Sequence, residues 1–223
     1  MTEILATQRL DHPDHEQVYR TFYDSHGKAG PWRDRPGDGT RPDRERMLSG
    51  PPPPWESQWE IWSRQWAITF AQHDLDGDAE AAANYLRDAL AVADAYPDAH
   101  DTIERLAASG LRLGLLSDAD DDFLMSTLSR TRLRFSVIQS SESLRAYKPH
   151  RAPFLALARH LGCETGEVLY VGDSPPRDVG GAGGAGMRTA WVRRSERQYP
   201  EQVARPDVEV TSLAAIADLF EAS

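Results

Sequence analysis

The chain has 223 residues, of which 40% are hydrophobic and 27% charged, proportions that fit a folded globular protein and exclude a wholly disordered chain. Its 25 basic and 35 acidic side chains give a formal net charge of −10. This charge repels phosphate groups, so we expect neither nucleic acid nor an anionic membrane surface as a partner. A chain of this length buries roughly 70% of its unfolded surface, enough to fold without a metal or a disulfide.

Two further features of the sequence bear on the cellular compartment of the protein. Cys163 is the only cysteine, so an intrachain disulfide is impossible and nothing indicates an oxidising compartment. The first residues lack a basic stretch followed by an apolar run, and no window approaches the 18 or more apolar residues that a membrane span needs. We therefore expect a cytoplasmic protein.

The first part of the chain is irregular and then helical. Residues 27–54 are rich in Gly, Pro, Arg and Asp and end in four prolines, which favour a stiff extended connection. A spacing of four, three, four and four residues predicts one helical face that carries Trp55, Trp59, Trp62, Trp66 and Phe70. A second helix is expected from about residue 78 to residue 94.

From residue 97 onward, short apolar runs alternate with amphipathic stretches. The predicted strands are Leu111–Leu116, Phe135–Ile138, Val168–Val171, Thr189–Val192 and Val208–Val210. The predicted helices are Ala99–Ser109, Asp121–Ser129, Arg151–Leu161, Val179–Ala185 and Ser212–Phe220. Strands and helices that alternate at this spacing predict an α/β fold with a parallel sheet covered by helices on both faces.

Polar residues follow three of these elements at positions where ligands bind in parallel sheets. Ser117 ends the first apolar run, Asp173 and Asp178 follow the third, and Lys148 precedes the helix that starts near residue 151. The carboxyl ends of parallel strands meet at one edge, so these side chains are expected to converge. A hydroxyl, a lysine and two carboxylates suit a phosphorylated ligand with Mg²⁺.

These residues carry a resemblance to the haloacid dehalogenase (HAD) superfamily over residues 97–194. Its second motif is similar to Leu-Gly-Leu-Leu-Ser117, its third to Lys148 in Ala-Tyr-Lys-Pro-His, and its fourth to Val-Gly-Asp173-Ser-Pro-Pro-Arg-Asp178. The resemblance implies a Rossmannoid core formed by residues 1–13 and 95–223, with a small helical cap, residues 14–94, inserted after the first strand. It also implies that Ser117 binds a phosphoryl or carboxylate oxygen, that Lys148 holds charge, and that Asp173 and Asp178 serve a Mg²⁺ ion.

The sequence departs from the family at the first motif, an apolar strand that ends in Asp-x-Asp. The only candidate strand is residues 4–6, which would put Thr7 at the position of the nucleophile and Arg9 at that of the acid/base, both lining the substrate pocket. Asp11 and Asp14 lie nearby at the wrong spacing. The loss of this nucleophile makes Mg²⁺ binding doubtful and typically lowers the rate by about 10⁴–10⁶.

A second candidate for the first motif is Asp74-Leu-Asp76-Gly-Asp78. The preceding residues belong to the aromatic helical face, which makes this segment a connection between two helices, where Asp-Gly is ordinary turn chemistry. A second departure is Asp118, which stands where members of the family commonly carry Asn after the motif-two Ser. If Asp118 points inward, it opposes an anionic ligand about as strongly as Lys148 attracts it.

Two functions follow from these expectations. The first is a HAD-fold protein that has lost aspartyl-nucleophile phosphohydrolase activity and has been put to another use. That use would be another reaction, or ligand or partner binding, with Ser117, Asp118 and Lys148 as candidate catalytic residues. Trp59, Trp62 and Trp66 either pack the cap, line a pocket for an aromatic ligand, or form a homodimer interface. The second function is an active Mg²⁺-dependent phosphatase or dehalogenase with an unconventional nucleophile position.

Overall fold

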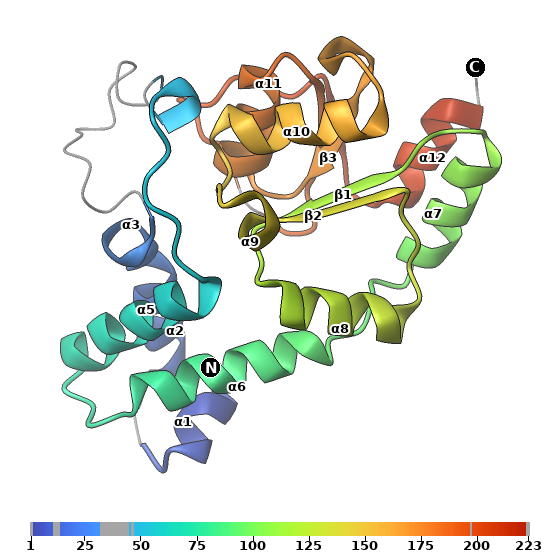
Figure 1. Cartoon of the computed structure of the whole chain (residues 1–223). Helices are drawn as coiled ribbons and strands as arrows, with labels where there is room; N and C mark the ends of the chain where they lie inside the picture. The colour runs from blue at the N-terminus through green and yellow to red at the C-terminus, as the bar shows by residue number, and fades with distance from the viewer. Residues whose placement is uncertain (1, 11–13, 32–44, 46, 197, 222–223) are drawn as a thin grey trace. The chain divides into compact units, whose positions relative to one another are not determined.

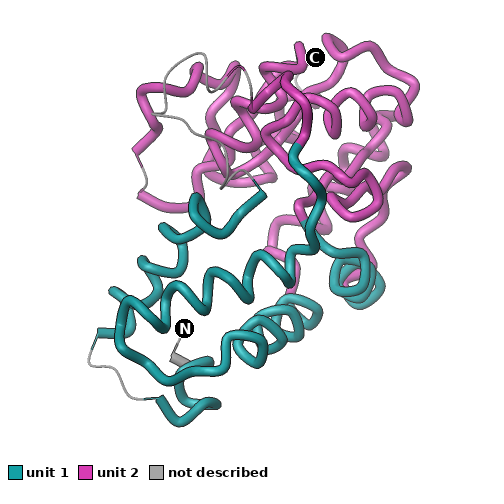
Figure 2. The backbone as a smooth tube through the Cα atoms, turned by 60° about the vertical axis from the view of Figure 1, so that its left-hand side comes forward, with its two compact units in different colours: residues 1–38, 53–93, 119–130 teal, residues 39–52, 94–118, 131–223 magenta. Residues whose placement is uncertain are grey.

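A computed structural model describes residues 2–10, 14–31, 45, 47–196 and 198–221. The chain divides into two compact units, coloured separately in Figure 2. Unit 1 comprises residues 1–38, 53–93 and 119–130, and unit 2 comprises residues 39–52, 94–118 and 131–223. The chain passes from unit 1 to unit 2 and back, so neither unit is one continuous segment.

Unit 1 is helical. Its helices are α1 (Thr2–Thr7), α2 (His15–Asp24), α3 (His26–Ala29), α5 (Gln58–Gln72), α6 (Ala79–Ala91) and most of α8 (Asp121–Thr131). Helices α5 and α6 confirm two helices in residues 55–94. Because α5 begins at Gln58, Trp55 precedes the helix, which corrects its predicted place on the aromatic helical face. The segment Asp74–Asp78 connects them, as expected, and the Asp78 carboxylate accepts a hydrogen bond from Ala81 N (3.0 Å) to cap α6.

The aromatic face of α5 builds the core of unit 1. Trp66 is 1% exposed and lies between the rings of Phe22 and Phe70, with ring centroids 4.6 and 5.2 Å away. Trp59 is half-buried and donates its indole N–H to the side chain of Asn84 on α6 (2.9 Å). Trp62 is half-buried against Phe123 of α8, with ring centroids 5.5 Å apart. These three tryptophans therefore join α5 to α2, α6 and α8 within unit 1.

The first residues of the chain are helical, which corrects the candidate strand at residues 4–6. Ile4 and Leu5 lie in α1 and are buried in the same core as Val18 and Trp66. Neighbouring side chains on a helix are only about 100° apart, so both can reach one broad buried surface, whereas a strand would point them in opposite directions. The side chain of Gln8 then bonds to both the N–H and the carbonyl of Asp78 (2.7 and 2.8 Å), which fixes the end of α1 to the start of α6.

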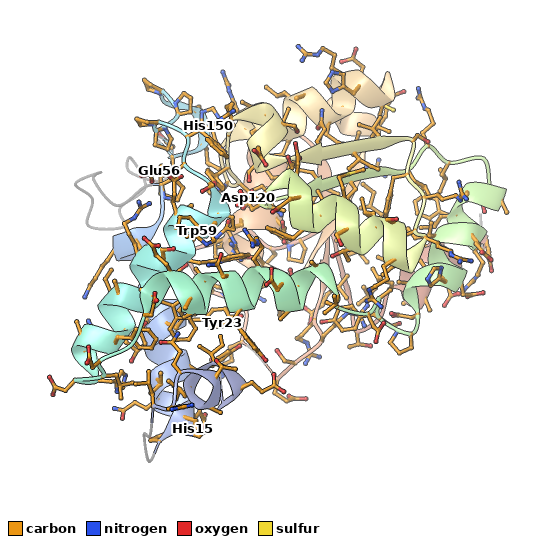
Figure 3. The ribbon with its side chains drawn as sticks, turned by 60° about the horizontal axis from the view of Figure 1, so that its bottom comes forward. His15, Tyr23, Glu56, Trp59, Asp120 and His150 are labelled. Carbon is orange, nitrogen blue, oxygen red and sulfur yellow. The ribbon has the colours of Figure 1, made fainter. Side chains whose placement is uncertain are left out.

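A buried carboxylate fixes the start of α5. Ser57 forms a capping box with Glu60, and Asp120 accepts hydrogen bonds from the backbone N–H groups of Gln58 (2.7 Å) and Trp59 (3.0 Å). Figure 3 labels Asp120 and Trp59 at this junction. Free N–H groups at a helix start favour a negative charge, so Asp120 ties the α8 segment to α5.

Unit 2 contains the strands and the remaining helices. Its strands are β1 (Gly114–Ser117), β2 (Val137–Ser140), β3 (Leu169–Gly172), β4 (Arg188–Val192) and β5 (Val208–Val210). Its helices are α7 (Ala99–Ala108), α9 (Ser141–Leu144), α10 (Arg151–Leu161), α11 (Gly180–Gly184) and α12 (Ala214–Glu221). A 3₁₀ turn covers Thr165–Glu167 and a π-helical turn covers Pro175–Val179. Each of the five predicted strands overlaps one of these strands, although β1 and β2 begin three and two residues later than predicted. The five helices predicted after residue 97 correspond to α7, α8, α10, α11 and α12, of which α8 lies mostly in unit 1, whereas α9 was not predicted.

The strands form two parallel sheets. β1 pairs with β2, with Leu115 opposite Ile138, and β3, β4 and β5 pair in that order, with Val171 opposite Ala190. Two apolar layers cover the strands. One contains Leu116, Tyr170 and Phe154 of α10, and the other contains Ala190, Leu106 of α7 and Ile216 of α12. The α/β fold with parallel strands and helices on both faces is therefore confirmed.

The compact units differ from the predicted core and cap. Residues 1–13 were expected with the α/β core and belong to unit 1, which also takes residues 119–130. The difference arises because α1 packs on the helical core instead of forming a strand. None of the described helices combines the length and the hydropathy that crossing a bilayer requires.

We expect Asp120→Ala to lower the stability of unit 1. The change leaves two N–H groups at the start of α5 without their carboxylate, at a cost of about 2 kcal/mol and a fall in Tm of about 4–8 °C. Thermal unfolding followed by circular dichroism measures this effect. Asp88→Ala is the matched control, since the side chain of Asp88 is 71% exposed and its ion pair with Arg87 contributes little. An equal loss in both variants would contradict the role given to Asp120.

Candidate functional site

A buried ion pair lies at the centre of the candidate site in unit 2. Lys148 Nζ lies 2.7 Å from Asp178 Oδ1, and the two side chains are 12% and 5% exposed. Lys148 comes just before α10, and Asp178 lies in the turn that follows β3. The pair therefore joins two segments that are 30 residues apart in the chain, and it confirms that these two predicted site residues converge.

Gly172 allows Asp178 to approach β3 this closely. A Cβ at residue 172 would lie 2.4 Å from the Asp178 carboxyl carbon, a distance that no side chain could tolerate. The second carboxylate oxygen of Asp178 accepts a hydrogen bond from Ser174 N (2.9 Å). The Gly-Asp sequence thus has a local cause, because a residue without a side chain lets the turn fold back over the end of the strand.

Two further groups surround Lys148. The Tyr170 hydroxyl of β3 lies 3.5 Å from Lys148 Nζ and 3.5 Å from Asp178 Oδ1, and it donates to the carbonyl of Leu116 (3.4 Å). Asp118 follows β1, and its Oδ1 accepts a hydrogen bond from Lys148 N (3.1 Å). Asp118 therefore points toward the lysine segment, which settles the orientation that the sequence left open.

The electrostatics of the cluster keep Lys148 charged. Burial acts to lower the pKa of Lys148, but Tyr170, Asp178 and Asp118 outweigh burial and raise it above its ordinary value. Burial raises the pKa of Asp118, and the nearby Lys148 only partly opposes this shift. Burial also raises the pKa of Tyr170, so its hydroxyl stays protonated at neutral pH.

The other two predicted site residues of unit 2, Ser117 and Asp173, lie at the ends of strands but differ in exposure. Ser117 is half-buried at the end of β1, opposite Ser140 of β2. The side chain of Asp173 is exposed, and its backbone carbonyl accepts a hydrogen bond from the Trp191 indole N–H (3.1 Å). Ser117, Asp118, Lys148, Asp173 and Asp178 all belong to unit 2, while their predicted roles in chemistry stay predictions.

The residues predicted to replace the first motif lie in unit 1. Thr7 is the last residue of α1 and donates its hydroxyl to the carbonyl of Ile4 (2.8 Å), within its own helix. Arg9 is exposed just after α1, with a φ of 56°. Neither residue follows a strand, so the placement of Thr7 and Arg9 at a strand end is wrong. Asp14 caps α2 through Gln17 N (2.9 Å), and Asp11 lies outside the described residues.

The described carboxylates do not form a ready site for Mg²⁺. Magnesium takes oxygen ligands in octahedral geometry, usually one or two carboxylates with water and substrate oxygens. Both oxygens of Asp178 are occupied, one by Lys148 and the other by Ser174 N. Among the residues that the structure describes, no group of three His, Cys, Asp or Glu side chains could hold a metal ion. Asp178 is thus engaged in hydrogen bonds within the protein, and the metal-binding roles of Asp173 and Asp178 stay predictions.

Tyr170 is a part of the site that the sequence did not reveal. It lies inside an apolar run that predicts a buried strand, and the structure places it in β3 at 8% exposure. The alternation of side chains along a strand could have indicated this role. Tyr170 and Gly172 are two residues apart, so they lie on the same face of β3, and Asp178 folds back over that face. A hydroxyl on that face at the end of a strand indicates a polar partner nearby.

We expect Lys148→Met to destabilise unit 2 strongly. The variant leaves Asp178 buried without its cation, at a cost of about 3–5 kcal/mol. Urea denaturation followed by tryptophan fluorescence measures the loss. Lys28→Met is the matched control because Lys28 is the other lysine of the sequence and is exposed. A loss below about 1 kcal/mol for Lys148→Met would contradict the importance given to the pair.

We expect Asp118→Asn to stabilise the protein at neutral and mildly alkaline pH. A carboxyl group whose pKa is raised on folding binds more protons in the native state, so stability falls as pH rises from about 3.9, the unfolded value, through the higher folded pKa. An asparagine at residue 118 keeps an oxygen that accepts the hydrogen bond from Lys148 N, and it avoids the free-energy cost of burying a charged carboxylate. Its Tm should exceed that of the unmodified chain by about 2–4 °C at pH 8 and by less at pH 4. A lower Tm at pH 8 would contradict the burial of an unfavourable charge.

Comparisons with known proteins agree with this architecture. Residues 65–192 match the family model described as haloacid dehalogenase-like hydrolase. The chain is 31% identical over 149 residues to the (S)-2-haloacid dehalogenase of Pseudomonas sp. (strain YL), an alignment that covers 66% of this chain and 63% of that protein. The chain thus spans less than two thirds of the length of this relative.

Two solved structures show the same fold. The L-2-haloacid dehalogenase from Xanthobacter autotrophicus, with chloropropionic acid covalently bound, superposes with a TM-score of 0.74 at 20% identity, over 98% of this chain and 92% of that chain. The putative HAD-hydrolase YfnB from Bacillus subtilis, bound to magnesium, superposes with a TM-score of 0.72 at 16% identity, over 98% and 88% of the two chains. Because the family model covers more than half of the sequence, the chain belongs to the haloacid dehalogenase-like hydrolase family.

Proposed function

We propose that the lysine site of unit 2 binds a small carboxylated or phosphorylated molecule and that residues 1–223 alone do not hydrolyse it through an aspartyl nucleophile. The observation that carries this proposal is the engagement of the carboxylates beside Lys148. Asp178 holds Lys148 Nζ and Ser174 N, and Asp118 holds Lys148 N. A carboxylate tied up in this way is a poor nucleophile, because attack would break the bonds that stabilise its charge.

Anion binding is supported by the charge and position of Lys148. The lysine stays protonated, and its backbone N–H bonds to Asp118, the residue that follows the half-buried Ser117 at the end of β1. This edge is where parallel sheets bind ligands.

An aromatic ligand held by the tryptophans receives less support. Trp66 is a core residue, and Trp59 and Trp62 are engaged with Asn84 and Phe123 in the packing of unit 1. We therefore take the ligand to be a small anion. A homodimer interface at these tryptophans remains a prediction from the sequence.

Turnover assays test the proposal. The purified chain is incubated with 2-chloropropionate, followed by chloride release, and with p-nitrophenyl phosphate and 5 mM MgCl₂. We expect turnover of both substrates to be slower than 1 s⁻¹ by a factor of about 10⁴ or more, because no carboxylate attacks the substrate. Turnover near 1 s⁻¹ that Asp173→Asn abolishes would contradict the proposal and favour a working hydrolase.

Ligand-induced changes in Tm test the binding half of the proposal. Phosphate and 2-chloropropionate at 10 mM should raise the Tm of the unmodified chain and of Lys28→Gln by a few degrees. The rise should disappear in Lys148→Gln, and Ser117→Ala gives a second reading if the lysine variant does not fold. Equal rises in all four proteins would show that the anions act elsewhere.

A further inference from the structure

A cavity of about 520 Å³ lies in unit 2, between the end of α9 and one face of α10. Figure 1 shows α9 and α10 as neighbours, joined by residues 145–150. This volume falls within the range of roughly 300–1,000 Å³ that is typical of pockets for small molecules. Lys148 and Asp178 are not among the described residues that line the cavity, so it is a different site from the one around Lys148.

A sharp turn builds the first wall of the cavity. α9 ends at Leu144, and Arg145 then adopts a φ of 50°, in the left-handed region. The N–H of Ala146 donates a hydrogen bond to the carbonyl of Ser141 in α9 (3.2 Å), which fixes this turn. The chain changes direction at Arg145, and the residues on either side of it, Leu144 and Ala146, both line the cavity.

α10 supplies the second wall with a face that its own core does not use. Four of its side chains are buried in the apolar layer against β1 and β3, namely Phe154, Leu157, Ala158 and Leu161. A different set lines the cavity and includes Ala152, Leu155, Ala156 and Arg159. Residues three or four positions apart lie on one face of a helix, so this set forms one surface. Leu155 is 41% exposed, which leaves its side chain available to a ligand.

Arg159 is the one side chain of the described lining that can form a hydrogen bond, since the others are leucine, alanine and proline. It is exposed, and its guanidinium has no hydrogen bond or ion pair with any residue that the structure describes. A guanidinium presents its N–H groups in a planar fork that matches the two oxygens of one carboxylate. Apolar walls beside this cation favour a ligand with one anionic end and an apolar body.

We propose that this cavity binds a short aliphatic carboxylate, whose head pairs with Arg159 and whose chain lies along Leu144 and Leu155. A peptide fits less well, because its backbone N–H and C=O groups need partners that leucine, alanine and proline side chains do not offer. An inorganic anion would leave the apolar walls uncovered. The proposal goes beyond the site around Lys148, because it adds a second ligand-binding position to unit 2.

Calorimetric titration with a series of carboxylates tests the site. The probes are butanoate, hexanoate and octanoate, each at concentrations that do not form micelles. Every added CH₂ group that becomes buried should strengthen binding by about two- to fourfold. Octanamide has a chain of the same length without the charge, so it should bind about tenfold or more weakly than octanoate.

A pair of variants assigns the charge to Arg159. Arg159→Met keeps an unbranched side chain and removes the guanidinium, so it should bind octanoate about tenfold or more weakly and octanamide as well as the unmodified chain does. Arg188→Met is the matched control, because Arg188 is exposed at the start of β4 and is not among the described lining residues. A cation in the last turn of a helix also stabilises that helix. The octanamide comparison separates this role from binding, since a less stable site would weaken both ligands.

Filling the cavity tests where the ligand lies. Ala152→Phe introduces a ring from an exposed position of α10 that lines the cavity, so it should abolish octanoate binding and leave the circular dichroism spectrum unchanged. A second measurement uses the unmodified chain and does not depend on the folding of this variant. Amide resonances of residues 144–146 and 152–159 should shift in nuclear magnetic resonance spectra as octanoate is added.

Three results would overturn the proposal. The first is octanoate binding that is not saturable or that Arg159→Met leaves unchanged. The second is a set of shifted resonances that lies outside residues 144–159. The third is loss of octanoate binding in Ser117→Ala, since the carboxylate would then lie in the site around Lys148. Turnover and phosphate binding do not enter these measurements, so failure here is distinguishable from failure of the proposed function.

Discussion

A lysine ammonium removed from water needs a carboxylate within hydrogen-bond distance, and in unit 2 Asp178 meets Lys148 at 2.7 Å. The remaining geometry of the site follows from this requirement. Residue 172 must be a glycine so that the turn after β3 can fold back, and Ser174 N must point inward to hold the second oxygen. Both oxygens of the carboxylate that stabilises the lysine are thereby engaged by groups of the protein itself.

Much of this organisation could be predicted from the sequence. The alternating apolar and amphipathic runs after residue 97 indicated every strand of unit 2, because buried parallel strands require continuous apolar residues. The spacing of Trp59, Trp62 and Trp66 indicated the helix of unit 1. Lys148 and Asp178 could be expected to meet, since residues at the carboxyl ends of parallel strands share one edge.

Other features depended on tertiary contacts that local patterns do not contain. Ile4 and Leu5 look like a short strand, but a buried face against Val18 and Trp66 makes the segment helical. The direction of Asp118 could not be read from the sequence, because a residue after a strand can turn either way. The role of Tyr170 could not be predicted, because a tyrosine in an apolar run is typical of a core residue and only the structure shows what its hydroxyl contacts. The division of the chain into these two units was not predicted either. The boundary falls between Asp118, which belongs to unit 2, and Asp120, which belongs to unit 1.

The separation of the two sheets has a consequence for how unit 2 assembles. β3, β4 and β5 come from one uninterrupted stretch of chain, as do β1 and β2, so each sheet can form early through contacts that are close in sequence. No ladder of backbone bonds connects the two among the described residues. The two sheets are therefore held together by side-chain packing. On one face the side chains of α10 provide it, and on the other face α7 packs on α12. There Arg105 binds Asp218 and Glu221 at 2.6 and 2.7 Å. Unit 2 is therefore built as two cooperative blocks held by helices, and loosening a helix would release one block while the other persists.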